Sequence, residues 1–253
     1  MDKNPGGSYK AISDNLDKEL KGYKKLGNHV KRYKFASKYC KGLKVLEVGC
    51  GYGFGALLLN GEAEYVGVDI DHEAIKWANG HINKGRFLLL ENLEEMYSYA
   101  YFDIVISFEV IEHVSDPKNL LNILKSNAKP NGKIIVSTPN GYYSHHIQAK
   151  FRSPYHIDEY NALELLNIIE DSGFHKFELF KEQRIDHLDS RGIKEMERNQ
   201  NSLPKGGTNL VTNIFAKFFN GQSLWKITQL NLKSGELNGY STILAILDNE
   251  PFE

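Results

Sequence analysis

The sequence predicts an α/β domain built on a parallel sheet. From about Lys41 onward, short apolar runs alternate with helical patterns, as they do when crossover helices join parallel strands. A glycine-rich stretch at 46–55, "LEVGCGYGFG", follows the first apolar run, which is where such folds place a strand-to-helix turn. The 253 residues, 41% of them hydrophobic, are enough for one domain with a substantial core.

Seven apolar runs are predicted to be strands. They are short and separated by turn residues or helical patterns, which favours strands over buried helices. The first five cover 43–48, 64–69, 86–90, 102–107 and 133–137, and two late strands follow at 174–182 and 241–247.

Three helices can be placed between these strands from their end signals. Asp71 is expected to cap a helix whose apolar face is Ile75, Ala78 and Ile82. A second helix begins near Pro117 and ends before the turn at 130–132. Asp158 is expected to open a third, with Ala162, Leu165, Leu166 and Ile169 on one side and Gly173 at its end.

We expect one domain over 1–253, with three peripheral parts. Residues 1–42 are charged and compatible with a helical cap. The segment 140–160 is rich in Tyr and His and follows the fifth strand, so it is a candidate substrate lid, with an ordinary surface loop as the other interpretation. The segment 184–239 is rich in Asn, Ser, Gly and Lys and is interpreted as an insertion.

Charge and cysteine content narrow the functional class. A net charge of -1 gives no overall field that would attract nucleic acid or an anionic membrane. Two cysteines, one of them inside the glycine stretch, do not form a disulfide framework. The first residues have no signal-peptide pattern, and no apolar run approaches the ~18 residues of a membrane span. A cytoplasmic protein without membrane or nucleic-acid partners is therefore expected.

The glycines at 49, 51 and 53 predict a ligand-binding turn, because glycine lets a ligand approach backbone N–H groups at the start of a helix. A tight turn without a ligand is the simpler alternative. Gly51, Gly53 and Ala56 also fit the dinucleotide pattern G-x-G-x-x-A. However, Glu47 would repel a pyrophosphate and would instead favour the ammonium of S-adenosylmethionine, held directly or through water.

Two further carboxylates fit an adenosine group. Asp69 ends the second strand and can accept hydrogen bonds from both ribose hydroxyls. After the third strand, Glu91 can accept from an adenine amino group, while the backbone at Asn92 and Leu93 meets the ring edge. Taken alone, Glu91 is also what a solvated loop would contain.

Four motifs, in this order and spacing, resemble the class I S-adenosylmethionine-dependent methyltransferases: "VLEVGCGYGFG", "GVDID", "FDIVISFEVIEHVSDP" and "KPNGKIIVSTPN". The resemblance runs from about 28 to 180. It implies a Rossmann-like, seven-stranded, mostly parallel sheet with helices on both faces and an antiparallel last strand. The cofactor would bind at the carboxyl ends of the first strands.

The same resemblance implies a set of cofactor contacts. Glu47, Gly49, Gly51 and Gly53 would surround the methionine part, Asp69 and Ile70 the ribose and adenine, and Glu91, Asn92 and Leu93 the adenine edge, while the Phe108 backbone would receive the ammonium. Glu91 departs from the more usual Asp. "NHVKRYKFA" is similar to a lead-in of bacterial relatives in which Arg32 or Tyr33 approaches the cofactor carboxylate. An amphipathic cap helix is the alternative for this segment.

The segment "FEVIEHV" after the fourth strand supplies the candidate catalytic residues, His113 and Glu109. If the segment is helical, Glu109, Glu112 and His113 lie at i, i+3 and i+4 and share one face. His113 is the candidate base, because an unperturbed imidazole pKa of ~6.5 suits proton removal near neutral pH. The alternative is that His113 packs against the cofactor and the glutamates stabilise a short helix.

"EVIEH" also resembles ubiquinone-pathway O-methyltransferases and small-RNA 2′-O-methyltransferases in which such residues hold a divalent metal. In that interpretation Glu109, Glu112, His113 and a later histidine are the ligands, with His156 preferred over His145 and His146. The expectation is a metal-free base, with the metal site as the alternative.

The predicted function is methyl transfer from S-adenosylmethionine to a small-molecule acceptor, at a hydroxyl oxygen. RNA 2′-O-methylation is the alternative within the class. A nicotinamide-dependent oxidoreductase or a non-catalytic nucleoside-binding relative is the alternative outside it. Glu47 argues against the oxidoreductase, and the intact motifs argue against a non-catalytic protein. The fold class alone does not identify the acceptor.

Overall fold

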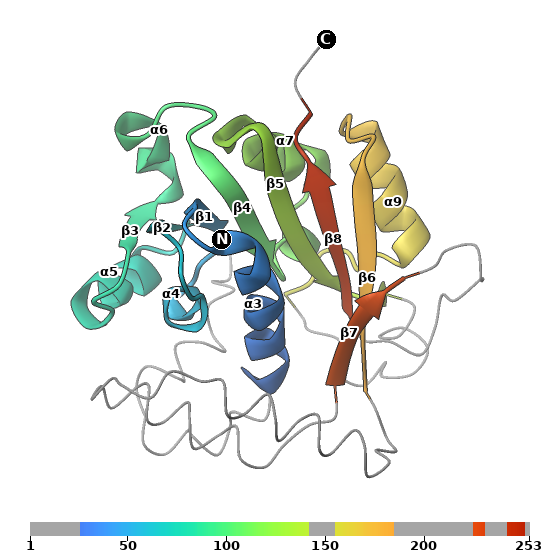
Figure 1. Ribbon diagram of the computed structural model, residues 1–253, viewed down its shortest axis with the longest axis horizontal. Helices are drawn as coiled ribbons and strands as arrows, with labels where there is room; N and C mark the ends of the chain where they lie inside the picture. Colours follow the sequence, from blue (N-terminus) through green and yellow to red (C-terminus); the bar gives the residue numbers. More distant parts are fainter. Residues whose placement is uncertain (1–25, 142–154, 185–224, 231–241, 251–253) are drawn as a thin grey trace.

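A computed structural model describes residues 26–141, 155–184, 225–230 and 242–250. Its centre is an eight-stranded sheet with the order β3-β2-β1-β4-β5-β8-β6-β7 (Figure 1). The strands are β1 Lys44–Val48, β2 Glu64–Asp69, β3 Arg86–Leu89, β4 Phe102–Phe108, β5 Ala128–Pro139, β6 Phe177–Arg184, β7 Trp225–Gln229 and β8 Thr242–Asp248.

The first five strands run parallel to one another. Strand β8 pairs antiparallel with both β5 and β6, so β6 points the same way as β5. Strand β7, at the sheet edge, pairs antiparallel with β6. The predicted fold class is confirmed, and β7 is an additional edge strand formed by part of the 184–239 segment.

Helices cover both faces of the sheet. They are α3 Leu26–Cys40, α4 Phe54–Leu58, α5 His72–His81, α6 Leu93–Met96, α7 Pro117–Asn127 and α9 Ala162–Asp171, with short 3-10 turns η2 Leu90–Asn92 and η3 Ile111–His113. In Figure 1, α3 lies in front of the sheet and α7 and α9 lie behind it. None of the helices in the described ranges is both long and apolar enough to cross a membrane.

The core is divided by the sheet into two apolar layers. Leu46 of β1 and Val105 of β4 pack toward α7 and α9, whereas their neighbours Val45 and Ile104 pack toward α3 and α5. This alternation follows from the period-2 geometry of strands, which directs successive side chains to opposite faces. The sheet is therefore buried on both sides, as parallel sheets are.

The helix signals are partly confirmed. Asp71 caps α5 by accepting from the backbone N–H groups of Glu73 and Ala74. Pro117 is the first residue of α7, and Gly173 follows α9 with a positive φ of 75°.

The predicted start of α9 at Asp158 is wrong. The helix begins after Asn161, whose side chain accepts from the backbone of Leu163 and Glu164, while Glu164 bonds back to the Asn161 N–H. This reciprocal capping box satisfies backbone donors at the helix start that a cap at Asp158 would leave unpaired. The fifth strand is also longer than expected, because β5 includes the predicted turn at 130–132.

Candidate functional site

A cavity of about 800 Å³ lies at the carboxyl ends of β1, β2 and β4. Its walls include the ends of these strands, the glycine turn after β1, the first residues of α5 and α7, and part of α3. The sheet order reverses between β1 and β4, and open α/β sheets bind ligands in the crevice at such a switch point. This cavity is therefore the candidate site.

The glycine turn forms one wall through Gly49 and Gly51. Gly49 has a φ of 81°, and a Cβ there would lie 2.3 Å from a methyl group of Val110. Only glycine therefore fits between the turn and the loop after β4. Gly53 does not line the cavity but precedes α4 with a φ of 75° and packs on the ring of Phe87.

Asp69 lines the cavity at the end of β2, as predicted. One carboxylate oxygen accepts from Gly51 N–H at 2.7 Å and the other from Asp71 N–H at 3.0 Å. A carboxylate has about four lone-pair sites, so two remain for a ligand. The next residue, Ile70, also lines the cavity, and its side chain is 72% exposed.

The residues predicted to meet the adenine edge are not brought to the cavity. Glu91 is exposed, Leu93 is buried in the core, and neither these nor Asn92 is among the residues that line it. Leu90 lines the cavity instead. The reason is local, because the chain turns into η2 and α6 directly after β3 and carries residues 91–93 away.

Glu47 lies beneath the glycine turn and is fully buried. Its two carboxylate oxygens accept from the hydroxyl groups of Tyr33 and Tyr65. Burial raises the pKa of Glu47 to about 7, although both hydroxyl hydrogen bonds oppose the shift. Glu47 does not line the cavity, whereas Tyr33 does, so this carboxylate reaches the site through the tyrosine.

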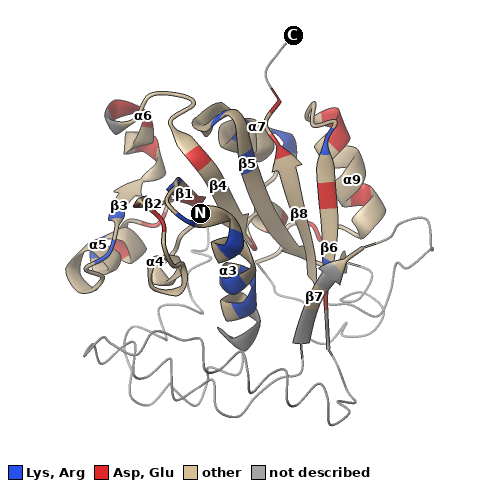
Figure 2. Cartoon of the chain, in the orientation of Figure 1, with Lys and Arg blue, Asp and Glu red and all other residues tan. Residues whose placement is uncertain are grey.

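Arg32 connects α3 to the sheet. Helix α3 carries several basic residues and no acidic one (Figure 2). The carboxylates that pair with the buried guanidinium of Arg32 therefore come from other elements. Arg32 is 2.6 Å from Glu109 after β4 and 3.4 Å from Glu182 of β6. Burial raises the pKa of Glu182 to about 7, against the influence of Arg32.

Glu109, a predicted catalytic residue, is held in this charged cluster. Its φ is 57°, which turns the backbone before η3 starts. Ser137 donates a 2.9 Å hydrogen bond to the same oxygen that pairs with Arg32. Burial opposes ionisation, but Arg32 and the nearby His29 outweigh it, so the pKa of Glu109 lies below its ordinary value.

The predicted helical arrangement of Glu109, Glu112 and His113 is wrong. Only Ile111–His113 form a 3-10 turn, and Glu109 lies outside it. Glu112 is fully buried, accepts from the Thr138 hydroxyl at 3.1 Å with Oε2, and has no hydrogen-bond partner for Oε1 among the described residues. Burial raises the pKa of Glu112 well above its ordinary value.

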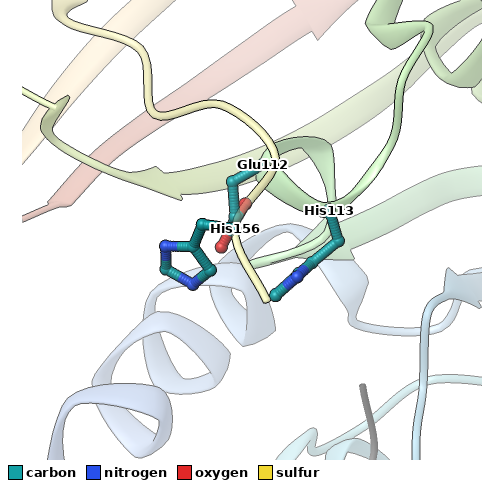
Figure 3. Close-up of side chains that lie close together, drawn as sticks. All are labelled: Glu112, His113 and His156. Atoms are coloured by element: carbon teal, nitrogen blue, oxygen red, sulfur yellow. The ribbon is translucent and has the colours of Figure 1, made fainter. Parts of the chain in front are cut away.

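Glu112, His113 and His156 form a compact cluster (Figure 3). One potential ligand atom from each lies within 4.8 Å of the others, and the two imidazole rings meet edge to face with centroids 4.8 Å apart. Glu109 is not part of this cluster. The structure therefore brings together three of the four residues considered as metal ligands.

Both histidine rings are oriented through Nδ1. His113 Nδ1 is 3.0 Å from the Tyr155 carbonyl oxygen, which only accepts, so Nδ1 carries the hydrogen and Nε2 is free. His156 Nδ1 is hydrogen-bonded to the buried carboxylate of Glu159. Burial lowers the pKa of His113, and the hydrogen bond to Tyr155 opposes that shift.

Several residues at the site were not predicted. His29 of α3 lines the cavity, and burial together with Arg32 lowers its pKa to about 4. The pairing of Arg32 with Glu109 and Glu182 joins elements far apart in sequence, so no local pattern signalled it. Glu159 lies only three residues after its partner His156, a spacing from which no contact was predicted. His145 and His146, and most of the segment 140–160, lie outside the described residues.

Comparison with known proteins relates this chain to methyltransferases. A family model described as "Methyltransferase domain" matches residues 12–179. A "Probable S-adenosylmethionine-dependent methyltransferase" of Mycolicibacterium smegmatis is 34% identical over 142 residues, covering 53% of this chain and 53% of that protein. A mitochondrial ubiquinone biosynthesis O-methyltransferase of Dictyostelium discoideum is 34% identical over 131 residues, covering 46% of this chain and 41% of that protein. The chain thus spans about half the length of curated relatives that it matches, or less.

Solved structures support the fold. An S-adenosylmethionine-dependent methyltransferase of Thermotoga maritima superposes with a TM-score of 0.59 at 14% identity, covering 94% of this chain and 98% of that one. The YcgJ protein of Bacillus subtilis gives 0.56 at 16% identity, covering 88% and 99%. At these identities the likeness concerns the fold alone. Because the family model covers well over half of the 253 residues, the chain belongs to the methyltransferase domain family.

Proposed function

We propose that this protein transfers a methyl group from S-adenosylmethionine to a hydroxyl oxygen of a small molecule. The observation that carries the proposal is the cluster of Glu112, His113 and His156 beside the cavity formed by the glycine turn and Asp69. A cavity of about 800 Å³ suits a cofactor together with a small acceptor, since ligand pockets span roughly 300–1,000 Å³. Relatives named as ubiquinone biosynthesis O-methyltransferases support oxygen as the acceptor atom.

The cofactor end of the site is built from local motifs. Asp69 keeps lone pairs for both ribose hydroxyls after its two backbone hydrogen bonds. The exposed side chain of Ile70 is the apolar surface that an adenine ring would cover. The absence of a Cβ at Gly49 and Gly51 leaves their backbone accessible from the cavity.

Glu47 acts on this site indirectly. Its carboxylate holds the hydroxyl of Tyr33, and the Tyr33 side chain forms part of the cavity wall. A carboxylate beneath the turn also disfavours a pyrophosphate at the same place. This argues for S-adenosylmethionine over a nicotinamide dinucleotide.

His113 is the proposed base. S-adenosylmethionine supplies a methyl group that is already activated on a sulfonium, so the residues of the chain mainly have to align the acceptor and remove its proton. The Tyr155 carbonyl fixes His113 with Nε2 unprotonated, and burial keeps the ring neutral. As the O–CH₃ bond forms and the S–CH₃ bond breaks, the hydroxyl proton passes to Nε2 of His113.

A divalent metal is the second candidate for this cluster, and the residues present fit one. Glu112 Oε1 is buried without a hydrogen-bond partner in the described part of the chain, and Nε2 of both histidines is left free by the bonds to Nδ1. One carboxylate and two imidazoles suit manganese or zinc. A metal held there would lower the pKa of a hydroxyl that it binds.

Labelled S-adenosylmethionine tests the proposed function directly. The protein is incubated with labelled cofactor and a panel of phenols and aliphatic alcohols, with amines, thiols and short RNAs as further arms. We expect label only in a hydroxyl-bearing small molecule. Label in RNA or at nitrogen would overturn the acceptor class, and affinity for NAD without affinity for S-adenosylmethionine would overturn the cofactor.

A chelator separates the two mechanisms. With His113 as an unaided base, EDTA leaves the rate unchanged, and His156→Ala has a smaller effect than His113→Ala. With a metal, activity disappears with EDTA and returns with manganese, and Glu112→Ala, His113→Ala and His156→Ala give similar losses. We favour the unaided base, because Glu109, the fourth metal ligand suggested by the family resemblance, is paired with Arg32 instead.

A further inference from the structure

We propose that Glu159 is a positioning residue that holds the His156 ring through Nδ1 and leaves its Nε2 available to the cluster with Glu112 and His113. The inference rests on the proposed function, in which this cluster handles the acceptor hydroxyl. Glu159 does not touch the cavity wall and would act only through His156. Neither the sequence motifs nor the comparisons assign it a role.

The hydrogen bond determines which tautomer His156 adopts. Glu159 Oε1 is bonded to His156 Nδ1, and an ionised carboxylate only accepts, so Nδ1 carries the hydrogen. The free nitrogen is then Nε2, the atom available to a proton or a metal. His113 is held in the same way by the Tyr155 carbonyl, so both rings are anchored at Nδ1. Outer partners of this kind set ring orientation and increase the basicity of the imidazole.

The backbone around Glu159 is held firmly against the sheet. Gly141 N–H donates to the Tyr160 carbonyl at 2.9 Å, and a Cβ on Gly141 would lie 2.2 Å from the Glu159 carbonyl oxygen. Glycine at the end of β5 therefore permits this close approach. On the other side, Ile157 N–H donates to the Glu112 carbonyl at 2.8 Å. Glu159 and the cluster are thus attached to the same framework.

Helix capping does not explain Glu159. The start of α9 is satisfied by Asn161 and Glu164, which form the capping box. The Glu159 side chain is only 1% exposed, and burying a carboxylate is unfavourable unless it is paired. The bond to Nδ1 of His156 is one pairing of this buried carboxylate, and it directs the carboxylate toward the cluster.

The experiment uses ¹⁵N-histidine NMR of the full chain to read the tautomer of His156, assigned by loss of its signal in His156→Ala. The parent is expected to show hydrogen on Nδ1. Glu159→Gln has an amide that can donate to Nδ1, so hydrogen is expected to shift to Nε2 in a substantial fraction of molecules. Glu159→Asp keeps the carboxylate and should restore the parent tautomer.

Manganese itself is the second probe, measured by calorimetry or electron paramagnetic resonance. If the parent binds it, Glu159→Gln should weaken binding by about 10- to 100-fold, the usual effect of losing such a partner. Glu170→Gln, an exposed carboxylate of α9, is the matched control and should leave both readouts unchanged. Affinity for S-adenosylhomocysteine should stay within about twofold, because the proposed cofactor contacts are elsewhere.

An unchanged His156 tautomer in both folded Glu159→Gln and folded Glu159→Met would overturn the inference, whatever the manganese result, because glutamine can still accept from Nδ1 through its oxygen whereas methionine cannot. If Glu159→Gln does not fold, Glu159→Met removes the acceptor without introducing an unpaired amide, and the same tautomer shift is required of it. Neither the NMR readout nor manganese binding requires a methyl-accepting substrate. Failure to find methyl transfer would therefore refute the proposed function while leaving this result standing.

Discussion

The two sides of the cavity are built in different ways. The cofactor side consists of the glycine turn and Asp69, each at the end of a strand and within a short stretch of sequence. On the opposite side Glu109 and His113 line the cavity. Behind them lie Arg32 of α3, which pairs with Glu109, and Glu112 and His156, which cluster with His113. The comparison teaches that a site made of backbone turns can be predicted from short stretches of sequence. A site made of side chains from several elements depends on how those elements pack.

The largest effect is expected from His113→Ala, which tests whether the side-chain half carries the chemistry. Loss of a general base should lower kcat by about 10² to 10⁴, with the dissociation constant for S-adenosylhomocysteine changed less than threefold. Rate measurements and calorimetry check this. His175→Ala, at an exposed histidine, is the control. A full rate in His113→Ala would return His113 to a packing role.

Arg32→Met should destabilise the fold by about 3 kcal/mol, because it removes a buried cation that pairs with the partly buried Glu109 and the fully buried Glu182. Denaturant unfolding measures the change, and Lys38→Met on the exposed side of α3 should stay within about 0.5 kcal/mol. The double variant Arg32→Met, Glu109→Gln should recover part of the loss. No recovery would show that Arg32 acts independently of Glu109.

Asp69→Ala probes the cofactor half. Removing a charge-assisted hydrogen bond costs about 1.5 to 3 kcal/mol, so binding of S-adenosylmethionine should weaken by about tenfold or more. Calorimetry with the parent and the variant checks it. Glu95→Ala, at an exposed carboxylate that does not line the cavity, is the control and should leave affinity unchanged. Parent-like binding by Asp69→Ala would contradict the ribose assignment.

The raised pKa of Glu47 predicts that the free energy of unfolding depends on pH. Its pKa rises from 4.5 to about 7 on folding, so the folded state binds more protons than the unfolded state between these values. The contribution of Glu47 to the free energy of unfolding is fully present below about pH 4.5 and is lost as the pH rises through 7. The loss is about 3 kcal/mol, since one pKa unit corresponds to about 1.36 kcal/mol. Relative to the parent, Glu47→Gln should lose less stability between pH 5 and 8. An identical slope would contradict this assignment.

The smallest effect separates two residues on the adenine side. Ile70→Ala removes an apolar surface that the cofactor would cover, and we expect affinity to fall about fivefold. Glu91→Ala should change affinity less than twofold, because Glu91 does not line the cavity. Both constants come from one calorimetric series. A larger loss in Glu91→Ala would mean that the loop after β3 moves onto the cofactor.

The outcome of the sequence-based predictions depended on how far along the chain the residues that determine each feature lie from one another. Asp69 does end β2 and lines the cavity, because a strand end fixes its neighbours within a few residues; its contact with a ribose stays a prediction. Glu91, Asn92 and Leu93 do not line the cavity, because the backbone turns into η2, which no pattern in "LLLENLEEM" indicated; their contact with adenine stays an untested prediction. Glu109 was assigned to the same helical face as His113, but its positive φ separates them.

The sequence by itself determined the fold class, the positions of the first five strands along the chain, the glycine turn and the carboxylate that ends β2. These features depend on hydrophobic periodicity and on backbone conformations that few residues adopt, so neighbouring residues in the sequence are enough to predict them. Only the tertiary structure decided that Glu47 lies under the turn with Tyr33 and Tyr65, that Arg32 takes Glu109, and that Glu159 holds His156. The contacts of Glu47 and Arg32 join different elements, whereas His156 and Glu159 are three residues apart. In every case a buried polar group is paired, and burial is a property of the folded chain.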